Sequence, residues 1–212
     1  MAEGNLATGV VLAGGLSRRM GGGDKGLLDI GGETMLGRVV GRLRPQVGRL
    51  ILNANGDAGR FASLGLPVVG DTIVGYAGPL AGILAGMRWS LLHAPDVRHM
   101  VTVSSDVPFF PTDLVIRLAG AIVDRPATIA LAQSQGELHP IIGLWPVALA
   151  DDLERQLETG VRKVLQWTDR HDTVSVAFEP VKIGGRIVDS FFNANTPEDV
   201  EIARAVLAAT ST

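Results

Sequence analysis

The stretch that decides the fold runs from Val10 to Lys25 and reads VVLAGGLSRRMGGGDK. It begins as a short apolar strand and continues directly into a loop with five glycines, three cationic residues and a single acid. Glycine lets backbone amides approach an anion because no Cβ stands in the way, and Arg18, Arg19 and Lys25 can neutralise that anion. A flexible surface turn would explain the glycines but not the three cations. The stretch therefore predicts a polyphosphate-binding loop after the first strand of an α/β fold.

Two common nucleotide-binding motifs do not fit this loop. Gly21, Gly23 and Gly26 satisfy the spacing of a dinucleotide-binding loop, but they lie about nine residues beyond the end of the strand that should precede them. A P-loop needs a lysine between glycine and serine or threonine, whereas Lys25 follows Asp24. The loop should therefore hold phosphates in another way.

The rest of the chain alternates short β-branched runs with longer helical patterns, which is typical of a mostly parallel sheet covered on both faces. The predicted strands cover Gly9 to Leu12, Arg49 to Asn53, Pro67 to Val69, Met100 to Val103 and Thr128 to Ala132. Three apolar stripes at helical spacing predict core-facing helices, and they comprise Met35, Val39 and Leu43, then Leu80, Ile83, Leu84, Met87 and Leu91, then Leu114, Leu118 and Ile122.

A last helix should begin at Thr196, which can cap it, with Pro197 in the first turn. Glu198 and Asp199 follow, where the helix dipole favours acids. The pattern contains no fixed-period repeat, low-complexity tract or long linker. We therefore expect one domain over residues 1–212, with its core at about residues 8–207.

Length and composition narrow the class of protein. The 212 residues include 19 Lys and Arg against 22 Asp and Glu, a net charge of −3, which lacks the basic excess of a nucleic-acid binder. With no cysteine, disulfides and thiolate chemistry are impossible, and a reducing cytoplasm is the expected location. No apolar run approaches the roughly 18 residues of a membrane span, and no export signal is evident at the start, so neither nucleic acid nor membrane is an expected partner.

A second polar site follows the predicted strand that ends at Val103. The sequence there reads Ser104-Ser105-Asp106-Val107-Pro108, which puts Asp106 at the carboxyl end of a buried strand. Open α/β sheets bind ligands at that rim, and a carboxylate there can hold Mg²⁺ against substrate phosphates. A turn or capping aspartate is the alternative, since Pro108 favours a turn. Combined with the cationic glycine loop, Asp106 indicates phosphoryl or nucleotidyl transfer.

Together these motifs resemble the molybdenum cofactor guanylyltransferases, within the larger class of nucleotidyltransferases that make sugar nucleotides and similar products. The resemblance extends from about Thr8 to Ala205. In chain order it rests on Leu12 to Leu28, Asn53-Ala54-Asn55, Asp71, Gly78-Pro79-Leu80-Ala81-Gly82, Ser105-Asp106-Val107-Pro108 and Asn193-Ala194-Asn195-Thr196-Pro197. His139-Pro140 also matches a His-Pro pair of the family.

The resemblance implies a single-domain, doubly wound, Rossmann-like nucleotidyltransferase fold with a mixed, mainly parallel sheet. It implies transfer of GMP from GTP to molybdenum-bound molybdopterin, which gives the molybdopterin guanine dinucleotide cofactor and pyrophosphate. It also implies transient contact with the enzyme that inserts molybdenum and with the molybdoenzymes that accept the product.

Two alternatives remain. A cytidylyltransferase on the same pterin tends to carry alanine where Gly14 stands. A non-catalytic nucleotide-binding module would be expected to lack Lys25 or Asp106, and both are present.

The family also implies roles for individual residues. Lys25, Asp106 and Arg19 would act in catalysis, with Mg²⁺ on Asp106. The nucleotide would be bound by Leu12, Ala13, Gly14, Gly15, Lys25, Asn53, Asp71, Gly82 and Asp106, where Gly15 and Gly82 give the base room to approach. The pterin would be bound by Arg162, Asn193 and Asn195, and the two asparagines would face the same way if their segment is extended.

Several of these residues have plain structural alternatives. Asn53 can simply end a strand, and Asp71 can be a turn acid. Asn193 and Asn195 can shape the turn before the last helix, and Arg162 can be a solvated residue at a helix start. The remaining histidines, His93, His99 and His171, have no patterned partner, so the sequence predicts no cluster of metal ligands.

Overall fold

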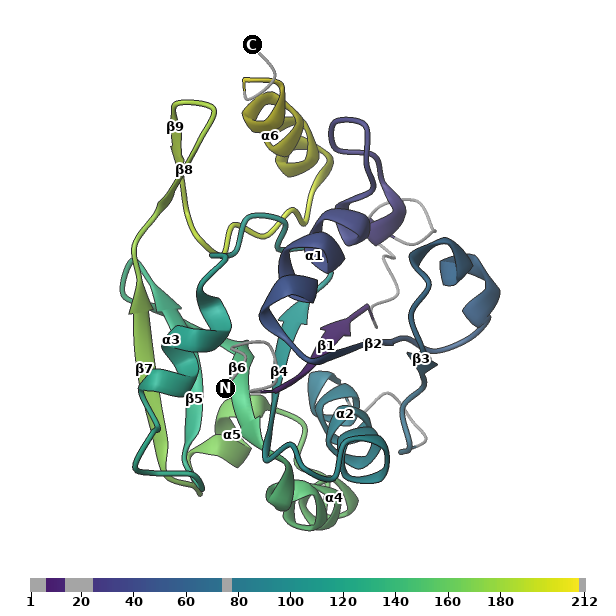
Figure 1. Cartoon of the computed structure of the whole chain (residues 1–212), viewed down its shortest axis with the longest axis vertical. Helices are drawn as coiled ribbons and strands as arrows, with labels where there is room; N and C mark the ends of the chain where they lie inside the picture. The colour runs from purple at the N-terminus through teal and green to yellow at the C-terminus, as the bar shows by residue number, and fades with distance from the viewer. Residues whose placement is uncertain (1–6, 14–24, 74–77, 210–212) are drawn as a thin grey trace.

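The computed structural model describes residues 7–13, 25–73 and 78–209, and a seven-stranded sheet forms its centre (Figure 1). The strand order is β3-β2-β1-β4-β6-β5-β7. The strands are β1 (Thr8–Leu12), β2 (Arg49–Asn53), β3 (Val68–Val69), β4 (His99–Ser104), β5 (Ile129–Ser134), β6 (Glu137–Pro146) and β7 (Thr173–Phe178). Strand β6 runs antiparallel to β4 and β5, while the other paired strands are parallel. The predicted mixed, mainly parallel, doubly wound α/β sheet is confirmed.

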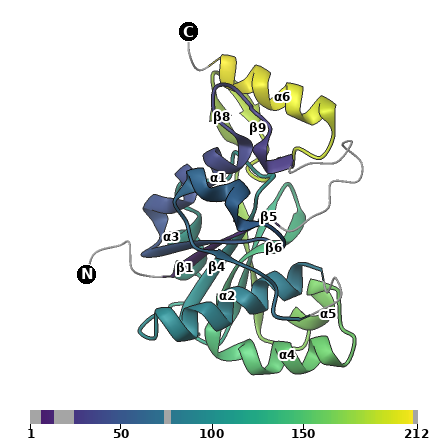
Figure 2. The same cartoon turned by 90° about the vertical axis from the view of Figure 1, so that its right-hand side faces the viewer.

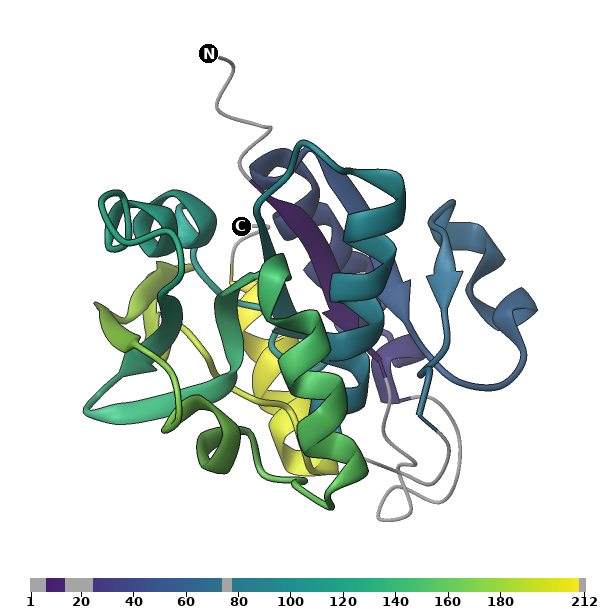
Figure 3. The same cartoon turned by 90° about the horizontal axis from the view of Figure 1, so that it is seen from below.

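Helices cover both faces of this sheet. Helices α1 (Met35–Leu43) and α3 (Leu114–Gly120) lie on one face, and α2 (Pro79–His93), α4 (Ala150–Glu158) and α5 (Val164–Thr168) lie on the other (Figure 2). Seen from below, the teal helix α2 and the green helix α4 lie side by side under the sheet (Figure 3). None of the helices in the described ranges is long and apolar enough to cross a bilayer.

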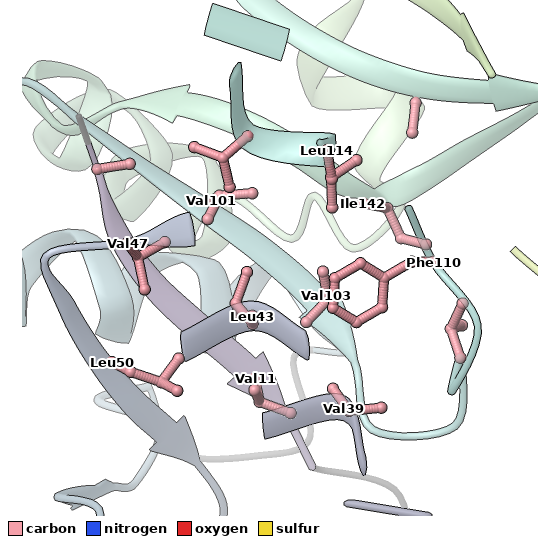
Figure 4. Packing of buried hydrophobic residues seen from close by; sticks show 14 of the residues in the cluster. Val11, Val39, Leu43, Val47, Leu50, Val101, Val103, Phe110, Leu114 and Ile142 are labelled. Atoms are coloured by element: carbon pink, nitrogen blue, oxygen red, sulfur yellow. The ribbon is translucent and has the colours of Figure 1, made fainter. Parts of the chain in front are cut away.

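The apolar stripe of α1 shows how these helices attach to the sheet. Val39 and Leu43 are fully buried and pack towards Val11 of β1 and Val103 of β4, with Phe110 closing the cluster (Figure 4). Removing one such side chain from water contributes about 1.5–3 kcal/mol. Burial on both faces explains why the central strands read as continuous apolar runs.

Besides the sheet and the helices on its two faces, a smaller group of elements covers the carboxyl end of β4 (Figure 1). It consists of helix α6 (Pro197–Ala208) and the hairpin of β8 (Val181–Ile183) and β9 (Arg186–Val188). Its buried cluster includes Ile30, Phe109, Val188 and Val200. The predicted start of α6 is confirmed, because Thr196 and Asp199 form a capping box and Pro197 occupies the first turn.

The structure corrects two members of the predicted helical stripes. Helix α3 ends at Gly120, so Ile122 is buried in the turn beyond it. Leu91 is 43% exposed because it lies in the last turn of α2, one residue ahead of the still more exposed Leu92. Helical spacing identifies the face of a helix but not the point at which the sheet beneath it ends.

Candidate active site

Three side chains from distant parts of the chain meet at the carboxyl end of β4. Lys25 Nζ lies 3.2 Å from Asp106 Oδ2 and donates a 2.6 Å hydrogen bond to Asn195 Oδ1. The Lys25 and Asp106 side chains are only 13% and 20% exposed. The cluster therefore places a cation, a carboxylate and an amide at the rim where open α/β sheets bind ligands.

Asp106 is anchored from several sides. Ser104 Oγ donates to Asp106 Oδ1, and the Ala194 amide donates to the Asp106 carbonyl at 2.9 Å. The amide of Ser105 extends the parallel ladder by donating to the Leu12 carbonyl at 3.0 Å. These bonds fix the carboxylate beside the end of β1, where the glycine-rich stretch begins.

A single carboxylate in this position suits Mg²⁺. Within the described ranges, no group of three or more His, Cys, Asp or Glu side chains could hold a metal ion by itself. Magnesium commonly binds through one or two carboxylates and completes its octahedron with waters and substrate phosphates. The donor set around Asp106 fits an ion that arrives with a nucleotide.

A second polar pair shapes a cavity next to this cluster. Asn53 ends β2, is 3% exposed, and donates to the Val69 carbonyl at 3.1 Å and to Asp71 Oδ1 at 3.0 Å. Asn55 Nδ2 donates to Asp71 Oδ2 at 2.7 Å, and Asn55 Oδ1 accepts from the Asp71 amide at 2.8 Å. The cavity measures about 70 Å³ and is lined by Leu12, Asn53, Asp71, Gly78, Pro79, Ser104 and Ile141.

Gly82 lies directly against Asn53 and Leu12. A Cβ at this position would lie 2.3 Å from Asn53 Oδ1 and 2.8 Å from Leu12 Cδ2. The missing side chain therefore makes room for Asn53 and Leu12. Gly82 acts on the cavity by letting α2 pack close to the ends of β1 and β2.

The three residues expected at the pterin lie in three different places. Asn193 lines a larger cavity, whereas Asn195 reaches Lys25. They do not face the same way along an extended segment, because the Asn195 amide donates to the Asn193 carbonyl at 3.1 Å in a tight turn. Arg162 lies elsewhere: its guanidinium donates to the Leu157 and Val161 carbonyls, and its own carbonyl lies beside Gly78.

Asp199 holds Asn195 in position. Its Oδ2 accepts the amides of Asn195 and Thr196 at 2.9 and 2.8 Å. Burial would raise the pKa of Asp199, but hydrogen bonds from Thr196 and Asn195, together with the charge of Lys25, lower it below its ordinary value. The carboxylate therefore stays ionised and couples the start of α6 to the cluster at Lys25.

Some expected residues cannot be placed, and others were missed. Gly14, Gly15 and Arg19 lie outside the described residues. Ala13 is described, and its amide continues the sheet by donating to the Asn53 carbonyl at 2.9 Å. Asn55 and Ser104 were not predicted as site residues. Asn55 belongs to the Asn53-Ala54-Asn55 motif and Ser104 lies two residues before Asp106, and these were the signals that could have identified them.

Comparison with known proteins identifies the family. Residues 9–174 match the model of the MobA-like NTP transferase domain. The chain is 50% identical over 207 residues to a molybdenum cofactor guanylyltransferase of Rhodopseudomonas palustris (strain BisB5), covering 97% of this chain and 96% of that protein. It is 49% identical over 201 residues to one of Bradyrhizobium sp. (strain ORS 278), covering 94% and 92%.

Solved structures agree on the fold. Molybdopterin-guanine dinucleotide biosynthesis protein A from Archaeoglobus fulgidus superposes with a TM-score of 0.72 at 21% identity, covering 95% of this chain and 98% of that one. The 4-diphosphocytidyl-2C-methyl-D-erythritol synthase from Anaerococcus prevotii gives a TM-score of 0.68 at 14% identity, covering 96% of each chain. With near-complete coverage at about half identity to named relatives, the chain belongs to the MobA-like nucleotidyltransferases, in the family of the molybdenum cofactor guanylyltransferases.

Proposed function

We propose that this chain transfers GMP from GTP to molybdenum-bound molybdopterin and releases pyrophosphate, as the names of its relatives indicate. One observation carries the proposal for the residues: the Lys25–Asp106–Asn195 cluster lies next to the Asn53–Asp71 cavity at one edge of the sheet. A cation and a carboxylate suit the phosphates, and the cavity suits part of the nucleoside. Residues 8–207 would act as one nucleotidyltransferase domain.

The reaction joins two phosphates without a covalent enzyme intermediate. An oxygen of the terminal phosphate of the pterin attacks the α-phosphorus of GTP, and the bond to the bridging oxygen of pyrophosphate breaks. That phosphate is already anionic at neutral pH, so no general base is needed to remove a proton. The chain must instead align the two phosphates and compensate charge as it moves onto the leaving group.

Lys25 supplies the charge compensation. In the described arrangement Lys25 and Asp106 neutralise each other. We infer that the ammonium group turns towards the phosphates when GTP binds, which frees Asp106 Oδ2 as a metal ligand. When bound there, Mg²⁺ supplies Lewis-acid charge stabilisation to the phosphate oxygens. Arg19 and the amides of Gly14 and Gly15 would add further contacts to the phosphates.

The nucleoside would lie along the ends of β1 and β2. Leu12 and Ala13 would contact it with backbone groups, and Asn53 and Asp71 with side chains. Gly82 would contribute by keeping Asn53 in position. Asn53 and Asn55 hold the Asp71 carboxylate in a fixed orientation, and a fixed carboxylate can accept hydrogen bonds from paired N–H donors on a base.

The remaining parts of the proposal concern surroundings. We expect Mg²⁺ as the working divalent metal, a cytoplasmic location, and transient contact with the molybdenum-insertion enzyme and with acceptor molybdoenzymes. The absence of cysteine agrees with a reducing compartment.

The test of this function is a turnover assay with Asp106→Asn. The wild-type protein should release pyrophosphate and form the guanine dinucleotide, detected by mass spectrometry, only when GTP, molybdenum-loaded molybdopterin and Mg²⁺ are all supplied. Asp106→Asn should lower turnover by at least about a hundredfold, because one Lewis-acid contact is worth several kcal/mol.

Asp96→Asn is the matched control. Asp96 is an exposed acid just before β4, whereas Asp106 lies just after the other end of that strand. Its turnover should equal that of the wild type. Mg²⁺-dependent turnover at the wild-type rate in Asp106→Asn would disprove the metal role. A wild-type protein that releases no pyrophosphate would disprove the function.

A further inference from the structure

A cavity of about 620 Å³ opens beside the active site, between the β5–β6 turn and residues 189–193. Its wall includes Val107 and Asn193, which are one and two residues away from Asp106 and Asn195. It also shares Ile141 with the cavity at Asn53 and Asp71. Its size lies within the roughly 300–1,000 Å³ of typical small-molecule sites, and its position suits a second substrate.

The backbone around this cavity departs from regular structure at two points. The pairing of β5 with β6 slips between Leu131 and Ala132, because Leu131 faces Gly143 while Ala132 faces His139. The turn that follows carries Gln135 at φ 49°, a left-handed conformation that is uncommon outside glycine. Gln135 and Ile141 line the cavity, so both irregularities shape its wall. Such features are often retained where a side chain must be aimed at a ligand.

A hydrogen-bond chain fixes the side chains on one wall. Ser134 Oγ donates to Asp189 Oδ1 at 3.0 Å, and Asp189 also accepts from the Phe191 amide at 2.7 Å and from Gln135 Nε2 at 2.6 Å. A hydroxyl has one proton, so at the 2.7 Å contact with His139 Nε2 the serine oxygen accepts. His139 therefore carries its proton on Nε2, and burial lowers its pKa although Asp189 and Glu137 raise it. The ring is neutral at pH 7.

The charges that line the cavity determine which part of the second substrate, molybdopterin, can bind there. Glu137 and Asp189 line it, and none of its described lining residues is a lysine or arginine. The Asp189 carboxylate is already occupied by three donors, whereas the Glu137 carboxylate has no partner among the described residues. Such a wall repels a phosphate or a molybdenum–dithiolene anion and favours an uncharged group with adjacent N–H donors.

We propose that this cavity holds the pterin ring of the acceptor, with the Glu137 carboxylate accepting hydrogen bonds from its 2-amino group and N3–H. The proposal rests on the proposed function, because molybdopterin is the acceptor only if that function holds. The two donors lie side by side on one edge of a pterin, which matches the two oxygens of a carboxylate. The neutral ring of His139 and the side chain of Phe192 also line the cavity and add uncharged surface to it.

This placement orients the whole acceptor. The pterin edge lies at Glu137, and the terminal phosphate extends past Asn193 towards Lys25, whose ammonium group leaves Asp106 when GTP binds in the proposed function. The two ends of the acceptor thus meet opposite charges. Glu137 is therefore a specificity-determining residue, which contacts the substrate far from the reacting atoms.

The test distinguishes an effect on the binding of molybdopterin from an effect on the binding of GTP. The experiment is steady-state kinetics with molybdenum-loaded molybdopterin and GTP varied in turn. The Glu137→Gln substitution should raise KM for molybdopterin by at least about tenfold. KM for GTP and kcat at saturating acceptor should stay within about twofold of the wild type. Glu158→Gln, an exposed acid on α4, is the matched control and should change nothing.

A binding measurement provides a second readout that does not depend on turnover. Quenching of the fluorescence of 6-hydroxymethylpterin should report binding to the wild type and to Glu158→Gln, and at least about tenfold weaker binding to Glu137→Gln. An unchanged acceptor KM in Glu137→Gln, or a lower kcat with unchanged KM, would overturn the proposal while the wild type still turns over. A wild type without GTP-dependent pyrophosphate release would instead overturn the proposed function.

Discussion

Asn53 links three parts of the candidate site through one side chain. It ends β2, bonds to the Val69 carbonyl and to Asp71, and occupies the space left by Gly82. The sequence predicted both Asn53 and Gly82 as nucleotide-binding residues, but not that one makes room for the other. That relation depends on how closely α2 approaches the sheet, which no local pattern encodes.

The first prediction follows from this contact. In Gly82→Ala the new methyl group would lie 2.3 Å from Asn53 Oδ1, so Asn53 must move and release Asp71. Calorimetry should show GTP binding weakened by at least about tenfold, together with a loss of stability of about 1–3 kcal/mol from overpacking.

Gly41→Ala provides the control for that variant. Gly41 is an exposed helical glycine on α1 with nothing within 4 Å of an added Cβ. It should gain about 0.5–1 kcal/mol of stability and bind GTP as the wild type does. Wild-type GTP affinity in Gly82→Ala would contradict the role of Asn53.

The second prediction concerns Lys25. Because its ammonium group is proposed to meet the phosphates and not the base, Lys25→Met should lower kcat by at least about a hundredfold. The affinity for guanosine should stay within about twofold, and Lys182→Met on β8 should leave both quantities unchanged. A Lys25 variant that loses only guanosine affinity would contradict this role, because the lysine would then bind the nucleotide in the ground state without stabilising the transition state.

At the scale of elements, α6 is the part that the sequence predicted most completely. Thr196, Pro197 and Asp199 are local signals for a helix start, and the structure confirms the capping box. Strand β6 is the opposite case. Its sequence holds Pro140 and Gly143, which disfavour a central strand, and it forms because the slipped pairing with β5 accommodates them.

The capping box gives a prediction about pH. The folded-state pKa of Asp199 is lowered, so its charged form contributes stability above the ordinary carboxyl range, and that contribution is lost as the pH falls through the folded pKa. Asp199→Asn should therefore cost about 0.3–1 kcal/mol of unfolding free energy at pH 7, and the difference should vanish well below about pH 4.

Urea denaturation at several pH values measures this difference. Glu198→Gln is the control, because it removes an exposed acid from the same first turn that has no hydrogen bond of its own among the described contacts. A difference between wild type and Asp199→Asn that persists unchanged in acid would contradict the coupling.

At the scale of the whole molecule, the fold assembles the site from segments that the sequence keeps far apart. Lys25 and Asn195 are 170 residues apart, and Ser134 and Asp189 are 55 residues apart. The motifs predicted Lys25 and Asn195 separately, one at the nucleotide and one at the pterin, but not that their side chains meet. The second pair had no such signal, since no sequence motif marks Ser134 or Asp189, and they meet only because β5 and the segment after β9 pack together.

The choice of nucleotide tests the central claim most directly. Guanine presents N1–H and a 2-amino group side by side, a donor pair that neither adenine nor cytosine reproduces, and a buried acceptor left unpaired costs roughly 1–3 kcal/mol. The measurement is pyrophosphate release with molybdenum-loaded molybdopterin and Mg²⁺, with GTP, CTP and ATP supplied at equal concentration. GTP should support transfer at least about tenfold better than CTP or ATP. Transfer from CTP at an equal or higher rate would contradict the guanylyl assignment and identify a cytidylyltransferase.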